Sequence, residues 1–281
     1  MNVLRERRQL LNVSYRLLGS LADSEDVVQE AYARWFALST ADQAAIVSPG
    51  AWLTTVTSRL CLNLLGSARV RRETYVGEWI PEPLPDVPGD DPADRVTLDE
   101  SIGMAFLVVL ESMTPAERVA FILHDVFGYP FDEIAQIVGR SSAASRQLAS
   151  SARRRLRAAP AGPPAAQATL VREFKQAWDA RDVAALIGLL DPSAIFVADG
   201  GGRAPTVLEP ILGGENIARA QVEIARVAPG VELVERMVNG QPGLIAQVDG
   251  VTVTVFAFRV ARDRITNIWA VRNPDKLRPW T

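Results

Sequence analysis

The sequence predicts a multidomain protein with two all-α domains, the second a helix-turn-helix, followed by an α+β domain. Three observations predict this order. Apolar residues recur with helical periodicity as far as Arg157, a proline-rich acidic segment interrupts the pattern at Glu78–Pro92, and alternating strand patterns begin at Val231. A chain of 281 residues with 48% hydrophobic residues is long enough to form more than one core.

Breaks in the pattern divide the chain into four segments. The five prolines within Glu78–Pro92 fix φ and remove N–H donors, so this stretch is expected to be an extended linker. A second break lies at Pro160–Pro164. An antiparallel meander is predicted over Val231–Val271, with Asp249-Gly250 as a two-residue hairpin turn. The predicted segments are a helical domain (1–76), an acidic linker (77–99), a helix-turn-helix domain (100–158) and an α+β domain (166–281).

Composition excludes several classes of protein. No apolar run approaches the roughly 20 residues of a membrane helix, and the N-terminal residues lack the apolar core of a signal peptide. The single cysteine, Cys61, and the single histidine, His124, leave no basis for a disulfide or a zinc cluster. We therefore expect a cytoplasmic protein without membrane contact, metal or cofactor. Because the net charge is −3, nucleic-acid binding must depend on local basic clusters.

A helix-turn-helix is predicted from Thr114 onward. Thr114-Pro-Ala-Glu117 is a capping box with proline at the first helical position, and its helix ends before Gly128. A short helix stopped by Gly139 and a basic helix up to Arg157 follow, and in this motif the last helix enters the major groove. The alternative is a solvated charged face on an ordinary three-helix bundle. The candidate base-reading residues are Ser142, Ser145, Arg146 and Gln147, and the candidate phosphate contacts are Arg153, Arg154 and Arg157.

Two motifs of the first domain point to a family. The segment Leu18–Phe36 is an acidic helix rich in aromatic residues, and Pro49-Gly-Ala-Trp-Leu begins a second long helix. Together they resemble region two of the extracytoplasmic-function sigma factors, and the helix-turn-helix then resembles their region four. The resemblance implies a factor that binds core RNA polymerase and directs promoter-specific transcription initiation. The alternative is a helix-turn-helix regulator that binds DNA alone.

The resemblance also implies how this domain meets its partners. The acidic helix suits docking on a basic protein surface, here the polymerase clamp helices, and the next helix suits the phosphates and splayed bases of a melted minus-ten element. The alternative is that these charges only complement the helix dipoles. The implied polymerase contacts are Asp23, Asp26, Gln29 and Glu30, and the implied minus-ten contacts are Arg59, Asn63, Ser67, Arg69, Arg71 and Arg72.

Three further motifs narrow the subgroup. The linker Tyr75–Pro83 resembles the Trp-Leu-Pro-Glu-Pro linker of sigma factors with a C-terminal SnoaL-like extension, while Asp199–Arg203 and Asn273–Leu277 resemble the two motifs of that extension. The resemblance implies an α+β SnoaL-like cone that controls the sigma factor, with no separate anti-sigma factor. We expect the glycine loop and the tail to contact the linker and the sigma domains. The expected regulatory residues are Trp79, Pro81, Glu82, Pro83, Asp199, Gly200, Gly201, Gly202, Arg203, Asn273, Pro274, Asp275, Lys276 and Leu277.

The last domain is the part for which a different activity has to be weighed. Its aromatic residues are typical of a plain core or of a cavity lining, so its ligand, if it has one, is unknown. It has no histidine or cysteine, and the carboxylates to consider, Asp199 and Asp249, lie in predicted turns. We therefore expect no catalytic residue and no enzyme activity; the alternative is a bifunctional protein with a small-molecule cyclase or isomerase domain.

Overall fold

The chain forms two compact units. A computed structural model describes residues 6–73, 75–86, 102–157 and 164–280, so residues 87–99 of the predicted linker lie outside the described part. The helical unit contains the described residues of Met1–Glu73 and Phe106–Ala159. The C-terminal unit contains those of Thr74–Asp86, Ile102–Ala105 and Pro160–Thr281. In the described part, no helix has the length and hydropathy needed to cross a membrane.

Four helices build the first part of the helical unit. They are α1 (Arg7–Leu18), α2 (Leu21–Phe36), α3 (Thr40–Ala45) and α4 (Pro49–Glu73). A left-handed Gly19 ends α1, and the Ser20 hydroxyl accepts a hydrogen bond from the Asp23 amide to cap α2. Apolar faces of α1, α2 and α4 form one core, in which the rings of Trp35 and Trp52 meet edge to face at 5.4 Å.

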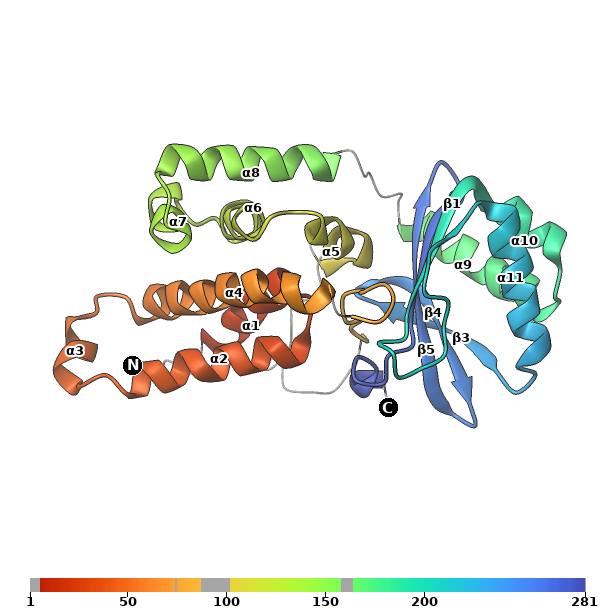
Figure 1. Cartoon of the computed structure of the whole chain (residues 1–281), viewed down its shortest axis with the longest axis horizontal. Helices are drawn as coiled ribbons and strands as arrows, with labels where there is room; N and C mark the ends of the chain where they lie inside the picture. Colours follow the sequence, from red (N-terminus) through yellow and green to blue (C-terminus); the bar gives the residue numbers. More distant parts are fainter. Residues whose placement is uncertain (1–5, 74, 87–101, 158–163, 281) are drawn as a thin grey trace. The chain divides into compact units, whose positions relative to one another are not determined.

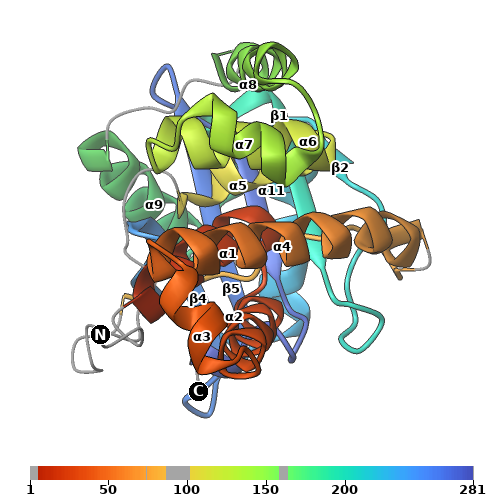
Figure 2. The same ribbon diagram turned by 90° about the vertical axis from the view of Figure 1, so that its left-hand side faces the viewer.

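The second part of this unit is the predicted helix-turn-helix. It contains α5 (Met104–Glu111) from Phe106 onward, α6 (Pro115–Phe121), a π-helical turn η4 (Ile122–Val126), α7 (Phe131–Val138) and α8 (Ser142–Arg157). The capping box is formed, since Thr114 and Glu117 exchange side-chain and backbone hydrogen bonds. Gly139 has a φ of 65°, which turns the chain sharply between α7 and α8. Figures 1 and 2 show α6 and α7 lying between α8 and α4.

The C-terminal unit is an α+β domain with a six-stranded sheet. The strand order is β2-β1-β6-β5-β4-β3, and β1 pairs with β6 in parallel while the other neighbours are antiparallel. The bounds are α9 (Pro164–Asp179), α10 (Val183–Leu189), β1 (Leu190–Asp199), β2 (Ile211–Leu212), α11 (Gly214–Val227), β3 (Glu232–Val238), β4 (Gln241–Val248), β5 (Val251–Ala261), β6 (Arg264–Val271) and η5 (Arg278–Trp280).

The sequence predicted the meander but not the whole sheet. Strands β3 to β6 are confirmed as an antiparallel meander, and Asp249 and Gly250 both have positive φ, as the hairpin turn requires. The parallel strand β1, the short edge strand β2 and helix α11 were not predicted. Figure 1 shows α9, α10 and α11 on one side of the sheet, and their core includes an edge-to-face contact between Phe174 and Phe258.

Candidate functional site

The carboxylate of Asp199, at the end of β1, is the centre of a site in the C-terminal unit that holds the linker. Its side chain is fully buried and accepts three hydrogen bonds. The donors are the Tyr75 hydroxyl at 2.7 Å, the Ile80 amide at 2.9 Å and the Lys276 ammonium at 2.6 Å. Three donors stabilise a charge that burial alone would strongly disfavour. We call residues 75–85, 199–203 and 273–280 the linker-docking site.

Lys276 joins the tail of the chain to the linker. Its ammonium group is largely buried, pairs with Asp199, and donates a second hydrogen bond to the Ile80 carbonyl at 2.5 Å. The ring of Trp79 lies with its centroid 4.1 Å from the same nitrogen, which is a close cation–π contact. A lysine held by a carboxylate, a carbonyl and an aromatic face thus fixes the position of the linker against the tail.

Tyr75 connects the same carboxylate to the tail. The Asn273 amide donates a hydrogen bond to the Tyr75 hydroxyl at 2.9 Å, while that hydroxyl donates to Asp199. Burial, together with the bond to Asp199, raises the pKa of the Tyr75 phenol above its ordinary value. The phenol therefore stays protonated and available as a donor.

The glycine loop allows these segments to approach closely. Gly201 has a φ of +59°, and a Cβ on it would lie 2.3 Å from Nδ2 of Asn273. A Cβ on Gly202, whose φ is +68°, would lie 3.1 Å from Val76. Side chains at these positions would displace the linker and the tail, so glycine is required for contact as well as for conformation.

A second set of contacts holds the end of the linker. Leu84 and Asn239 exchange hydrogen bonds of 3.0 and 2.8 Å, and Pro85 forms an isolated bridge with Val238 at the end of β3. The indole of Trp280 donates to the Pro83 carbonyl at 2.9 Å. Since Ile80 and Leu84 are 1% and 6% exposed, the predicted acidic linker is a docked and largely buried strap in this part.

The structure brings the predicted regulatory residues together in the linker-docking site. Arg203 of the glycine loop pairs with Asp275 of the tail, and this hydrogen bond lowers the pKa of the Asp275 carboxyl. Sequence reasoning did not select Asn239, Arg272 or Trp280, which also bind the linker or the loop. The only sequence signal for Asn239 was its place in the Asn239-Gly240 turn, where its φ is positive.

The predicted DNA-reading helix α8 presents some of its candidate residues to solvent. Arg146, Gln147, Arg154 and Arg157 are exposed. Gln147 and Arg154 line a hollow of about 970 Å³ that also includes residues of α4. Arg146 lies over the ring of Phe131, which holds its guanidinium at the N-terminal end of α8.

Three other candidates of α8 are engaged within the helical unit. Ser145 is fully buried and its hydroxyl donates to the Ser141 carbonyl, so its predicted role at base edges is not compatible with this position. The Ser142 hydroxyl donates to Asp132, and Arg153 pairs with Asp125 at 2.6 Å. Sequence reasoning missed the burial of Ser145 because serine occurs on either face of a helix.

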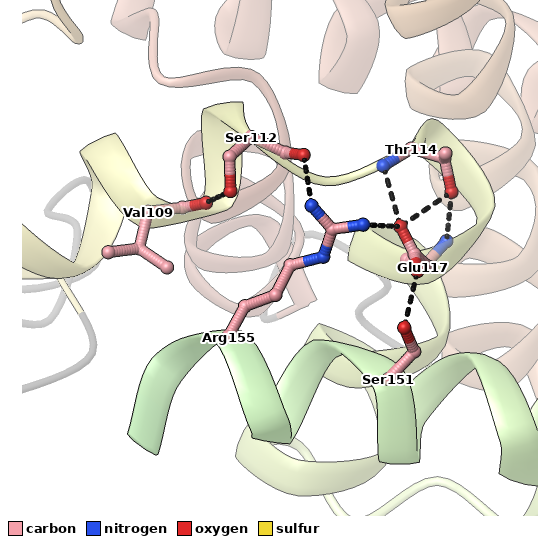
Figure 3. A network of polar contacts seen from close by, with 6 residues as sticks. All are labelled: Val109, Ser112, Thr114, Glu117, Ser151 and Arg155. Atoms are coloured by element: carbon pink, nitrogen blue, oxygen red, sulfur yellow. Dashed lines mark hydrogen bonds and ion pairs between the residues drawn. The ribbon is translucent and has the colours of Figure 1, made fainter. Parts of the chain in front are cut away.

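A polar network around the buried Glu117 fixes α8 against α6 (Figure 3). The Glu117 carboxylate accepts hydrogen bonds from the Thr114 amide at 2.9 Å and the Ser151 hydroxyl at 2.7 Å, and Arg155 pairs with it at 3.6 Å. Arg155 also donates to the Ser112 carbonyl at 3.0 Å. Burial acts to raise the pKa of Glu117, but these donors outweigh it and the net pKa is lowered. Arg155 is itself exposed, but these contacts give it a structural role within the helical unit.

The candidates in α2 and α4 occupy different environments. Asp26, Gln29 and Glu30 are exposed on α2, while Asp23 is half-buried in the first turn. Asn63 and Ser67 are exposed on α4. The side chains of Arg69, Arg71 and Arg72 lie outside the described part of the structure.

Polar contacts join the two parts of the helical unit. The Arg59 guanidinium of α4 donates to the Gln136 carbonyl of α7 at 3.0 Å. The Tyr129 hydroxyl donates to Thr54 at 3.0 Å, and the buried Arg118 donates to the Leu17 carbonyl at 2.9 Å. In this arrangement, the guanidinium of the candidate minus-ten residue Arg59 is thus hydrogen-bonded to the helix-turn-helix part.

Among the described residues, no group of three or more His, Cys, Asp or Glu side chains is arranged to hold a metal ion. His124 stacks on Phe131 and its Nδ1 lies 2.9 Å from the Tyr129 carbonyl, which is a packing arrangement. Asp249 lies at the tip of a hairpin, and Asp199 is engaged by the linker.

Comparison with known proteins identifies the family. Residues 3–71 match the family model of Sigma-70 region 2, and residues 103–156 match that of Sigma-70, region 4. The ECF RNA polymerase sigma factor SigJ of Mycobacterium tuberculosis is 40% identical over 285 residues, covering 96% of this chain and 90% of the relative. The chain belongs to the ECF RNA polymerase sigma factors. It is therefore an alternative sigma factor for transcription initiation, and the resemblance noted in its sequence is confirmed.

Solved structures agree with this assignment of the sigma factor. The crystal structure of the Mycobacterium tuberculosis extracytoplasmic function sigma factor SigJ matches with a TM-score of 0.78 and 36% identity, over 98% of this chain and 96% of that one. The match includes the C-terminal domain, so the predicted fold class of two sigma domains and an α+β domain is confirmed.

A more distant match is the sigma factor RpoE in complex with the anti-sigma factor NepR from Bartonella quintana. It has a TM-score of 0.40 and 21% identity, over 54% of this chain and 90% of that one. For the present sigma factor, the expected absence of a separate anti-sigma factor stays a prediction.

Proposed function

We propose that docking of the linker on the C-terminal unit regulates this sigma factor. The observation that carries the proposal is the buried Asp199–Lys276 pair, which binds Ile80 of the linker through both its amide and its carbonyl. Residues 75–86 separate the two sigma domains in the sequence. Docking removes them from the free tether, and a shorter tether raises the effective concentration of one domain at the other.

Docking of the linker thereby favours the arrangement in which the two sigma domains of the helical unit contact each other. In that unit, Arg59 of region two donates to Gln136 of region four, so a proposed DNA contact is occupied. Undocking lengthens the tether and favours separation of the two domains, as binding to two promoter elements requires. We therefore expect that weakening the linker-docking site raises transcription.

The proposed minus-thirty-five contacts are the exposed residues of α8. Arg146 and Gln147 lie near its N-terminus, where base edges are read, and Arg154 and Arg157 lie near its basic end, where phosphates bind. Ser142 and Arg153 belong to this set once their contacts with Asp132 and Asp125 are exchanged for DNA. Ser145 is left out, because it is buried.

Region two is proposed to bind the polymerase and the melted minus-ten element. The exposed acids of α2 provide the charge for a basic partner surface, and the polar face of α4 provides hydrogen bonds and positive charge. The proposed polymerase contacts are Asp23, Asp26, Gln29 and Glu30, and the proposed minus-ten contacts are Arg59, Asn63, Ser67, Arg69, Arg71 and Arg72.

The sigma factor relatives point to a transcription factor without enzyme activity, and we propose that its C-terminal domain also catalyses no reaction. Support comes from Asp199, whose carboxylate is occupied by three donors from the linker and tail. We further propose that the protein works in the cytoplasm with the bacterial RNA polymerase and promoter DNA.

Run-off transcription with purified core RNA polymerase tests the proposal, using the promoter upstream of the protein's own gene. Lys276→Met removes the cation that holds the linker, and Lys175→Met is the matched control because Lys175 forms an exposed pair with Asp179. The proposal predicts more transcript with Lys276→Met and an unchanged yield with Lys175→Met. Equal yields from both variants, with the linker shown to be undocked in the first, would refute regulation by docking.

The same assay tests the DNA contacts. Arg146→Ala is expected to reduce transcript at least about tenfold at a promoter with an intact minus-thirty-five element. Ser145→Ala is the control, since its hydroxyl faces the Ser141 carbonyl inside the helical unit. A larger loss for Ser145→Ala than for Arg146→Ala, with both proteins folded, would contradict the assignment of the reading face.

A further inference from the structure

The C-terminal unit contains a cavity between the sheet and α11. Its volume is about 490 Å³, which lies within the roughly 300–1,000 Å³ of small-molecule sites. All six strands or their ends contribute to one wall, through residues such as Phe196, Ile211 and Phe256. Trp178 of α9 and Ile224 of α11 complete the enclosure. The lining is predominantly aliphatic and aromatic, so it suits an apolar ligand body.

The mouth of the cavity is apolar as well. Val207, Ile224 and Val227 belong to the lining and are 40%, 42% and 61% exposed. Large apolar side chains that remain in contact with water beside a cavity provide an entry route for an apolar molecule. Glu223, the acidic residue of the lining, is exposed and forms a bidentate contact with Arg226. Its charge is therefore already balanced at the rim.

One guanidinium provides the polar end of the cavity. Arg272 belongs to the lining and is half-buried, and its Nε is a buried atom without a hydrogen-bond partner. Its Nη1 donates to the Pro205 carbonyl, which holds the side chain in place. A buried N–H of a charged group without an acceptor is costly, and such atoms in folded proteins generally have an explanation. Burial also lowers the pKa of Arg272.

The two features together select a ligand class. Water can accept a hydrogen bond from the guanidinium, but it is not stabilised in the rest of the cavity, because the apolar wall offers it few hydrogen-bond partners. A neutral hydrocarbon fills the volume but leaves Nε without an acceptor. A carboxylate on an apolar body satisfies both, because carboxylates form strong charge-assisted bonds with guanidinium groups.

We propose that the cavity of the C-terminal unit binds a small apolar monocarboxylic acid, with its carboxylate on Arg272 and its body between the sheet and α11. The site is distinct from the linker-docking site, since Asp199 and Lys276 are not among the residues that line the cavity. Binding itself does not depend on the regulatory role proposed above, so either can fail without the other.

The test is direct binding to the full-length protein by isothermal titration calorimetry at neutral pH. The probes are octanoate and 2-naphthoate, each compared with its neutral alcohol, 1-octanol and 2-naphthalenemethanol. The proposal predicts that at least one acid binds about tenfold or more tightly than its alcohol, since a hydrogen bond to a charged group has this effect. Alcohols that bind as tightly as their acids, or acids that do not bind up to their solubility limits, would overturn the proposal.

Two variants locate the site. Arg272→Met is expected to remove the preference for the acid while leaving the affinity for the alcohol unchanged, and Arg236→Met, on an exposed position of β3, is the matched control. Ala220→Trp places a large ring in the cavity from α11 and is expected to weaken both probes. Near-ultraviolet circular dichroism verifies the fold of each variant. A preference for the acid that survives Arg272→Met, or acid binding unaffected by a folded Ala220→Trp, would place the ligand elsewhere and refute the assignment.

Discussion

Replacement of Lys276 by methionine is expected to undock the linker. Methionine keeps much of the aliphatic volume but removes the ammonium group, which lies 2.6 Å from the Asp199 carboxylate and 2.5 Å from the Ile80 carbonyl. Asp199 would remain fully buried with two neutral donors, Tyr75 and the Ile80 amide. Removing one partner of a buried ion pair costs about 3–5 kcal/mol, because the other charge is left uncompensated.

The two remaining donors favour the lower end of that range. A loss of about 3 kcal/mol corresponds to roughly 100-fold in the equilibrium between docked and undocked linker. The amides of Ile80 and Leu84 report this equilibrium, since both donate to side chains of the C-terminal unit. Hydrogen exchange of peptides that contain these residues is therefore expected to be accelerated roughly 100-fold in Lys276→Met.

Two comparisons make this measurement decisive. Lys175→Met, which removes the exposed pair with Asp179, should leave exchange of the linker unchanged. Adding Asp199→Asn to Lys276→Met removes the uncompensated charge and should recover part of the lost protection. An acceleration of less than about tenfold in Lys276→Met would refute the reasoning, because it would mean that the buried pair does not hold the linker.

Three further outcomes follow from the same contacts. Gly201→Ala is expected to weaken linker docking by about 1–3 kcal/mol, because its Cβ would meet Asn273 at a φ of +59°; Gly188→Ala, with open space around its Cβ, should have no effect on linker exchange. Glu117→Gln should destabilise the helical unit by about 1–3 kcal/mol in denaturant titrations at neutral pH. Because the pKa of Glu117 is lowered, its contribution to the free energy of unfolding is present above its ordinary pKa of 4.5 and is lost as the pH falls through the lowered pKa. A difference in unfolding free energy between wild type and variant that stays constant down to acid pH would argue against the network. The raised pKa of Tyr75 implies that linker docking weakens as the pH rises above 10.0, and phenolate absorbance titrations of wild type and Tyr75→Phe should differ only above that pH.

The sequence predicted the elements whose signals are local. The capping box at Thr114, the turn at Gly139 and the hairpin at Asp249-Gly250 each depend on neighbouring residues, and all three are formed. Strand β1 was missed because its pairing with β6 is parallel and joins residues far apart in the chain. Helix α11 was not predicted, although its buried residues Ile217, Ala218 and Ala225 follow a helical spacing and belong to the core of the C-terminal unit.

The sequence by itself determined the order of domains, the family and the motifs of the linker, loop and tail. Only the tertiary structure decided what these motifs do together. It buries the Asp199 carboxylate under the linker, makes Ser145 part of the core and leaves an arginine at the end of a cavity. The physical reason is that hydrogen bonding and burial depend on distances between segments far apart in the chain. Tyr75 and Asp199, for example, are 124 residues apart, and residue order alone does not contain their distance.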